Sequence, residues 1–129
     1  MIINTTKSTA ESTTESGVKV AYGSYKGSGT YGEYNSNYLM FEFSPSLVIV
    51  QNADVDSTTN RDILIMLNSS MPIHIKISRD DFSVSGPEVY GFWEINSPND
   101  VLWYSETAAD QLNIKNCRYT YFAIGTGIG

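Results

Sequence analysis

The sequence has little with which to build a cross-link or a metal site. It contains one cysteine, Cys117, and one histidine, His74, in 129 residues. A single cysteine cannot form an intrachain disulfide, and the Cys-x-x-Cys pairs of a zinc site are missing. We therefore expect Cys117 to be a buried apolar thiol, and we expect neither a metal ion nor a cofactor.

Positive charge and long apolar runs are also scarce. Eight Lys and Arg face fourteen Asp and Glu, which gives a net charge of −6, and the basic residues are scattered. Nucleic acid and anionic lipid are bound by clustered basic side chains, so neither is an expected partner. No apolar run approaches the ~20 residues of a membrane-spanning helix. The start, Met1-Ile2-Ile3-Asn4, lacks the basic and apolar regions of a signal peptide.

The first sixteen residues differ in composition from the rest. Half of residues 1–16 are Ser or Thr, and none is aromatic. Such a segment buries too little apolar surface to offset its ordering entropy. We expect a flexible Ser/Thr-rich lead-in, or alternatively an attachment strand, before a single β-sandwich domain at 17–129. Deleting a flexible lead-in would leave the melting temperature nearly unchanged.

Aromatic and β-branched residues are abundant and fall in short alternating segments. Nine Tyr and five Phe favour strands. In 39–43 the odd residues Leu, Phe and Phe share one face. In 73–77 the isoleucines alternate with His74 and Lys76, which predicts isoleucines inward and both polar residues in solvent. Apolar residues stand at both odd and even positions in 62–68, which predicts a strand buried on both faces. A solvent-facing His74 has no predicted partner for catalysis or metal binding.

These segments recur at roughly ten-residue spacing, with Asn, Asp, Ser, Gly or Pro between them. The pattern predicts an all-β fold, an antiparallel β-sandwich or jelly roll of about eight strands. One short helical turn is expected near 105–113, "SETAADQLN", where Ser105 can cap and alanines and a leucine lie at helical spacing.

The stretch "KGSGTYGEY", 26–34, has the glycine spacing of a dinucleotide-binding loop at Gly27, Gly29 and Gly32. That spacing binds phosphate only where a helix follows and directs its N-terminus at the ligand. Here a turn and a period-2 strand follow. We interpret the loop as a structural connection between strands.

No arrangement of residues typical of an enzyme was found. The polar runs 54–60 and 80–81 lack the central Gly and terminal Glu of an EF-hand loop and are read as turns, although a calcium site built from separate loops stays open. No Gly-x-Ser-x-Gly motif is present. The carboxylates of Glu42, Glu94 and Asp100, on or beside strands, keep a small cell-wall glycan hydrolase as one alternative.

Three aromatic residues are the candidate ligand-binding residues: Trp93, Trp103 and Tyr104. Because Trp103 and Tyr104 are adjacent in a strand, one of them faces away from the core unless both faces are covered. In the structural interpretation, one of the two side chains packs in the core and the other packs under a second covered face. An exposed aromatic platform for sugar rings is the functional one.

Two long segments resemble a known family. "YGSYKGSGTYGEYNSNYLMFEFSPSLVIV" resembles a Gly-rich "GTYG" stretch followed by an "SLTFDF-P-KLVI"-like pair of strands. "NDVLWYSETAADQLNIKNCRYTYFAIG" resembles a "VSWYS" strand, an "A-QLN" turn and a "YYYVAIG" strand. This is the order of motifs in C-terminal domains of bacteriophage and prophage tail proteins. The resemblance covers roughly 20–53 and 99–125. It departs at 114–118, where relatives have a Gly- or Ser-rich spacer.

The resemblance implies a non-enzymatic virion module of the tail or fibre type, made in the bacterial cytoplasm. Its implied partners are other virion proteins or sister chains, with a homotrimer as one arrangement, and host-surface glycans. The alternative is a purely architectural oligomerising or decoration domain without a ligand. The family supplies no catalytic residues to carry over.

Overall fold

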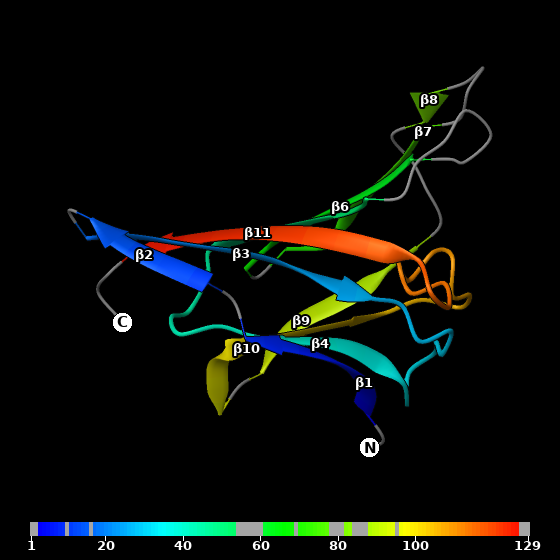
Figure 1. The fold of residues 1–129 in the computed structure, drawn as a ribbon, viewed down its shortest axis with the longest axis horizontal. Coiled ribbons are helices and arrows are strands. Elements are labelled where there is room, and N and C mark those ends of the chain that lie inside the picture. Colours follow the sequence, from blue (N-terminus) through cyan, green and yellow to red (C-terminus); the bar gives the residue numbers. More distant parts are fainter. Residues whose placement is uncertain are drawn as a thin grey trace.

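The computed structural model describes residues 3–9, 11–15, 17–53, 61–68, 70–77, 82–83, 88–94 and 96–126. These residues form eleven strands in two layers (Figure 1), and none of them is helical. The predicted all-β sandwich is therefore confirmed. Over the part of the chain described, no helix is long and apolar enough to cross a membrane.

The smaller layer is a four-stranded sheet. Its order is β1 (Ile3–Thr9), β4 (Ser36–Met40), β10 (Ser97–Tyr104) and β9 (Tyr90–Glu94). β1 runs parallel to β4, and the other two pairings are antiparallel.

The larger layer is a seven-stranded antiparallel sheet. Its order is β2 (Glu11–Glu15), β3 (Val18–Lys26), β11 (Arg118–Thr126), β5 (Leu47–Asn52), β6 (Arg61–Leu67), β7 (Ile73–Ile77) and β8 (Phe82–Ser83). The long strand β11 pairs with β3 on one side and β5 on the other, so the chain's last strand joins the two parts of this sheet.

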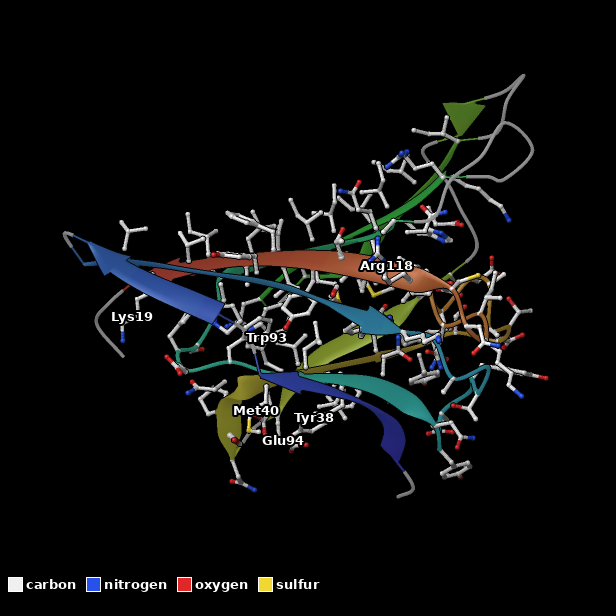
Figure 2. All side chains as sticks on the ribbon, in the orientation of Figure 1. Lys19, Tyr38, Met40, Trp93, Glu94 and Arg118 are labelled. Atoms are coloured by element: carbon white, nitrogen blue, oxygen red, sulfur yellow. The ribbon has the colours of Figure 1, made fainter. Side chains whose placement is uncertain are left out.

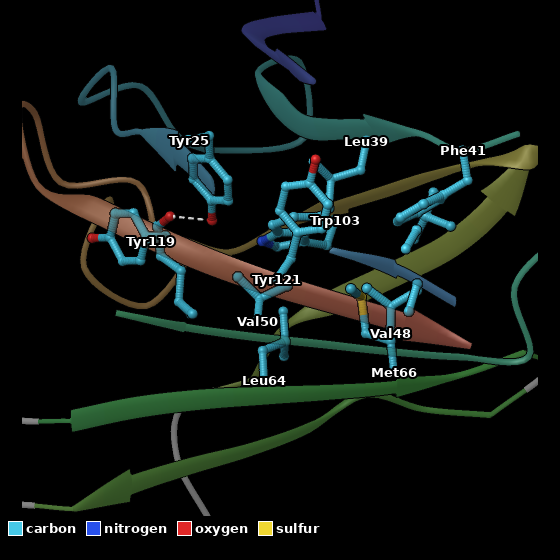
Figure 3. Close-up of a cluster of buried hydrophobic side chains, with 14 of the residues drawn as sticks. Tyr25, Leu39, Phe41, Val48, Val50, Leu64, Met66, Trp103, Tyr119 and Tyr121 are labelled. Carbon is cyan, nitrogen blue, oxygen red and sulfur yellow. Dashed lines mark hydrogen bonds between the residues drawn. The ribbon is translucent and has the colours of Figure 1, made fainter. Parts of the chain in front are cut away.

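The hydrophobic core fills the space between the two sheets (Figure 3). Alternate residues of β3, β5, β6, β10 and β11 enter it, as the period of 2 requires. Leu39 and Phe41 come from the β4 side, and Phe41 meets Tyr121 of β11 edge to face with ring centroids 6.0 Å apart. The expected shared face of 39–43 is confirmed, because Leu39, Phe41 and Phe43 are all buried.

Two strands lie within the segment predicted to be a lead-in. β1 pairs with β4, and β2 pairs with β3. Residues 1–16 were expected to be a flexible lead-in or an attachment strand, and strand pairing of this kind is what the second alternative predicts. The boundary at residue 17 between lead-in and sandwich stays a prediction.

The prediction that 62–68 is buried on both faces was wrong. In β6, Leu64 and Met66 are buried, but Ile63 and Ile65 are half-buried and Leu67 is 43% exposed. Apolar residues of both parities show that a strand has two apolar faces. They do not show that this chain supplies an element to cover both of them.

The orientation predicted for β7 was also wrong. His74 is buried, with its Nε2 2.9 Å from Oδ1 of Asp62, whereas Ile73 is 43% exposed. The register between β6 and β7 places His74 opposite Leu64, on the core side of the sheet. A buried imidazole is tolerated here because a carboxylate on the neighbouring strand satisfies it.

The expected helical turn near 105–113 is a series of hydrogen-bonded turns. The Gln111 N–H donates to the Thr107 carbonyl at the α-helical spacing, 3.0 Å. Leu112 then takes the left-handed conformation, with φ 57°, and its carbonyl accepts from the buried Tyr25 hydroxyl at 2.8 Å. The Asn113 N–H donates to the Ala108 carbonyl at 2.8 Å and the Leu112 N–H to the Ala109 carbonyl at 3.2 Å, which is the cap that ends a helix at a left-handed residue, so the segment stops after a single turn.

Candidate functional site

The glycine loop is part of the fold and offers no cradle for phosphate. The Gly27 N–H donates to the Cys117 carbonyl at 2.7 Å, and the Gly29 N–H donates to the Asn113 carbonyl at 2.8 Å. A Cβ on Gly27 would lie 2.0 Å from the Ile114 carbonyl oxygen, so only glycine fits there. The structural interpretation of this loop is confirmed.

The loop is fastened by the side chain of Gln111, which is fully buried. Its Oε1 accepts from the N–H groups of Gly32 and Ser105, at 3.0 and 2.9 Å. Its Nε2 donates to the Asn35 carbonyl and to Asn37 Oδ1, at 2.8 and 2.9 Å. The glycine loop and the start of β4 are therefore bonded to the segment around Gln111 through this amide.

Trp103 lies in the core and contributes nothing to the surface. Its exposed fraction is 0%, and its Nε1 donates to the Gln111 carbonyl at 2.9 Å. Trp93 is half-buried and packs against the core, with its Nε1 donating to the Pro45 carbonyl at 2.7 Å. Figure 2 shows it between the two layers. Both indoles therefore stabilise the sandwich interior.

Tyr104 is the candidate residue that the structure places on the outside. It lies opposite Tyr90 in the pairing of β10 with β9, on the face turned away from the seven-stranded sheet. The two rings stack with centroids 5.1 Å apart and an interplanar angle of 26°. Strand alternation thus separates the adjacent pair as expected, with Trp103 inward and Tyr104 outward.

This outer face of the four-stranded sheet is largely aromatic. Leu102 lies at its centre with Tyr38 and Phe92 as cross-strand neighbours, and it is fully buried. Phe92 itself is 37% exposed. Leu102, Tyr38 and Phe92 therefore occupy the middle of this face, and the Tyr90–Tyr104 pair lies toward one end of it.

Two shallow concavities adjoin this pair, and Tyr90 lines both of them. One, of about 280 Å³, is completed by Glu88, Ser105, Glu106, Thr107 and Asp110. The other, of about 290 Å³, is completed by Glu33, Met71, Gly91, Phe92 and Tyr104. Neither is lined by a described Lys or Arg, and the nearest cation given is Lys76, whose Nζ lies 3.8 Å from Oδ1 of Asp110 beside the first concavity. Their volumes lie just below the ~300–1,000 Å³ of small-molecule sites, which suits one or two small rings.

Carboxylates set the electrostatics of this region. The Tyr90 hydroxyl donates to Glu88 Oε2 at 2.9 Å, and that hydrogen bond, with the negative charge of Glu88, raises the pKa of Tyr90. Partial burial, followed by the charge of Glu33, raises the pKa of Tyr104. Both phenols therefore stay protonated at neutral pH. The Tyr104 hydroxyl can donate a hydrogen bond, whereas the Tyr90 hydroxyl, which donates to Glu88, can accept one. We call Tyr90, Tyr104 and the carboxylates of Glu33, Glu88 and Glu106 the tyrosine site.

The carboxylates considered for hydrolysis lie elsewhere. Asp100 is 8% exposed and accepts a hydrogen bond from the Tyr38 hydroxyl. That bond, followed by burial and the charges of Asp100 and Glu94, raises the pKa of Tyr38 to about 12. Figure 2 shows Tyr38 and Glu94 on the same outer face. Glu42 is exposed in the turn after β4.

The remaining candidates do not add to this site. Cys117 is half-buried and packs against the core. The runs 54–60 and 80–81, considered for calcium, lie outside the described residues. Within the described part of the chain, no group of three or more His, Cys, Asp or Glu side chains is placed to hold a metal ion.

Comparison with protein-family models, with curated proteins and with solved structures gave no match. The case for a function therefore rests on the tyrosine site and on the sequence. Sequence reasoning named Tyr104 but missed Tyr90, fourteen positions away. Tyr90 could have been found only by pairing "VYGFWEI" with "VLWYS" in the correct register, which no local pattern specifies.

Proposed function

We propose that this chain is a non-enzymatic virion module that contacts sugar residues of a host surface through the tyrosine site. The observation that carries the proposal is the stacked Tyr90–Tyr104 pair, partly exposed on a sheet face and adjoined by two carboxylate-lined concavities. The virion context is supported by the resemblance of 20–53 and 99–125 to phage tail domains.

The chemistry of a sugar ring suits such a surface. A pyranose has an apolar C–H face that packs on an aromatic ring, and hydroxyls at its edge that hydrogen-bond with carboxylates and phenols. Tyr104 offers an apolar ring and a protonated hydroxyl that can donate. Tyr90 offers an apolar ring and a hydroxyl oxygen that can accept, because its proton is donated to Glu88. The carboxylates of Glu33 and Glu106 provide acceptors in the two concavities.

Charge restricts the class of sugar. Carboxylates line both concavities, and the chain carries a net charge of −6. Uronates, sialates and phosphate-bearing polymers would meet like charge at this surface. The ligands that fit are therefore neutral or amino sugars, such as the glucosamine units of a cell wall.

Titration calorimetry with soluble oligosaccharides tests the proposal. We expect weak, saturable binding of neutral or amino-sugar oligomers and none of uronate oligomers. Tyr104→Ala should reduce the affinity about 10-fold or more, because it removes half of the stacked pair. A matched control is Tyr22→Ala, which truncates a 54% exposed tyrosine on the other sheet.

Several outcomes would contradict the proposal. These are equal affinities of the Tyr104→Ala and Tyr22→Ala variants, preferential binding of uronates, or no binding to the oligosaccharides and to purified cell walls. Release of soluble sugar from the walls would show hydrolysis. Trp103→Ala is not a test of the site, because truncating a buried Trp costs about 3–5 kcal/mol of stability.

A further inference from the structure

The seven-stranded sheet has an apolar outer face that is left partly exposed by the residues that the structure describes. One row of side chains crosses five strands of that face in register: Tyr22, Phe122, Ile49, Ile65 and Ile73. Tyr22 is 54% exposed, Ile73 43% and Phe122 40%, and the other two are half-buried. Figure 2 shows the side chains that project from this sheet away from the four-stranded sheet.

A second row lies beside the first and is equally free of charge. Val20, Ile124, Leu47 and Leu67 are cross-strand neighbours on the same face. We call the two rows together the apolar face. Within the five strands from β3 to β7, the charged residues of this face gather instead at one end, where Lys26 pairs with Arg118 and where Arg61 begins β6. Two glutamates, Glu11 and Glu15, stand in register with Tyr22 and Val18 on the edge strand β2.

The area of this face is comparable with that of a small protein–protein interface. A third uncharged row lies on the other side of the first: Ser24, Thr120, Gln51, Ile63 and Ile75. With strands about 4.8 Å apart and residues about 3.4 Å apart along them, three rows on five strands span roughly 24 by 20 Å. This gives roughly 500 Å² per copy, or about 1,000 Å² for two copies, which is where specific interfaces begin. Monomeric proteins rarely expose apolar patches larger than a few hundred Å².

We propose that the apolar face packs against the same face of a second copy, across a two-fold axis. A flat sheet face is best covered by another sheet, about 10 Å away with strands within about 30° of alignment. An identical face supplies that shape, and a two-fold axis makes the contact self-complementary. This inference is independent of the tyrosine site, which lies on the outer face of the other sheet.

Charge selects between the two ways of stacking the copies. If the strands of the two copies ran in the same direction, the basic end with Lys26 and Arg118 would meet its own counterpart. With strands in opposite directions, the basic ends lie at opposite edges of the interface, where water screens them. The two-fold axis therefore runs perpendicular to the strands. The dimer then displays its two tyrosine sites on opposite outer faces.

Sedimentation equilibrium with matched variants tests the inference. At about 100 µM, above the micromolar Kd expected for a small interface, the wild type should have twice the chain mass of 14.3 kDa. Phe122→Lys should weaken association about 100-fold or more, because it buries a charge in the apolar face. Phe92→Lys is the control, since Phe92 is 37% exposed on the other sheet, and it should stay dimeric.

A urea melt of each variant shows whether it is folded, and Tyr22→Lys serves as a second probe if Phe122→Lys is not. A monomeric wild type overturns the inference, and so does equal loss of association in Phe122→Lys and Phe92→Lys. A trimer overturns the two-fold arrangement. A wild-type dimer that only the apolar-face variants dissociate supports it. Because oligosaccharide binding is measured separately, failure of either proposal leaves the other intact.

Discussion

Replacing Gln111 with methionine tests how far the fold and the tyrosine site depend on one buried amide. Methionine has a similar length and keeps the side-chain volume, but it removes every strong hydrogen-bonding atom. Gln111 makes four hydrogen bonds, to Gly32, Ser105, Asn35 and Asn37. They join the glycine loop to the end of β10, next to Tyr104.

The expected loss of stability depends on which of the four hydrogen-bonding partners of Gln111 water can reach in the variant. The Ser105 N–H and Asn37 Oδ1 make buried bonds, whereas the bonds to Gly32 and Asn35 are only partly buried. Each buried group left unsatisfied costs about 1–3 kcal/mol. We therefore expect Gln111→Met to lower the free energy of unfolding by about 3–4 kcal/mol. Domains of this kind have about 5–15 kcal/mol in total, so the variant should still fold.

Urea unfolding followed by tryptophan fluorescence measures this loss. With m of about 1–3 kcal/mol/M, the midpoint should fall by about 2 M. Gln51→Met is the control, because Gln51 is half-buried on the outer face of β5, where its Oε1 accepts a partly buried hydrogen bond from Arg61 at 3.2 Å whose partner water can rehydrate. Changes at such a position are usually within about 0.5 kcal/mol. A loss at Gln111 below about 1 kcal/mol, or one equal to that of the control, would refute the central role of this amide.

Two further predictions concern pH and the N-terminal strands. The pKa of Tyr38 is raised from 10.0 to about 12, so its stabilising effect is complete below pH 10 and is lost as pH rises through about 12. Tyr38→Phe should therefore show a smaller decline of the urea midpoint above pH 10 than the wild type, and parallel declines would contradict this. Deleting residues 1–16 removes the partners of β4 and β3, so the melting temperature should fall by several degrees, at about 2–8 °C per kcal/mol. An unchanged melting temperature in calorimetry would instead support a flexible lead-in.

Local patterns were sufficient for the fold class and for the interpretation of the glycine loop. Alternation placed Leu39, Phe41 and Phe43 on one face, and all three are buried. The turn residues after Gly32 showed that no helix follows, and the loop's N–H groups are taken by the fold. Both inferences need only neighbouring residues, because strand period and turn chemistry are local properties.

What local patterns could not supply is which face of each strand is covered. Period 2 separates Trp103 from Tyr104, but only the packing of two sheets makes Trp103 the core residue and leaves Tyr104 beside Tyr90. The orientation predicted for β7 was wrong for the same reason. The carboxylate that satisfies the buried His74 comes from the neighbouring strand, which the local pattern does not show. Alternation decides which side chains share a face. Cross-strand register and the second layer, which depend on residues distant in sequence, decide whether that face meets the core or solvent.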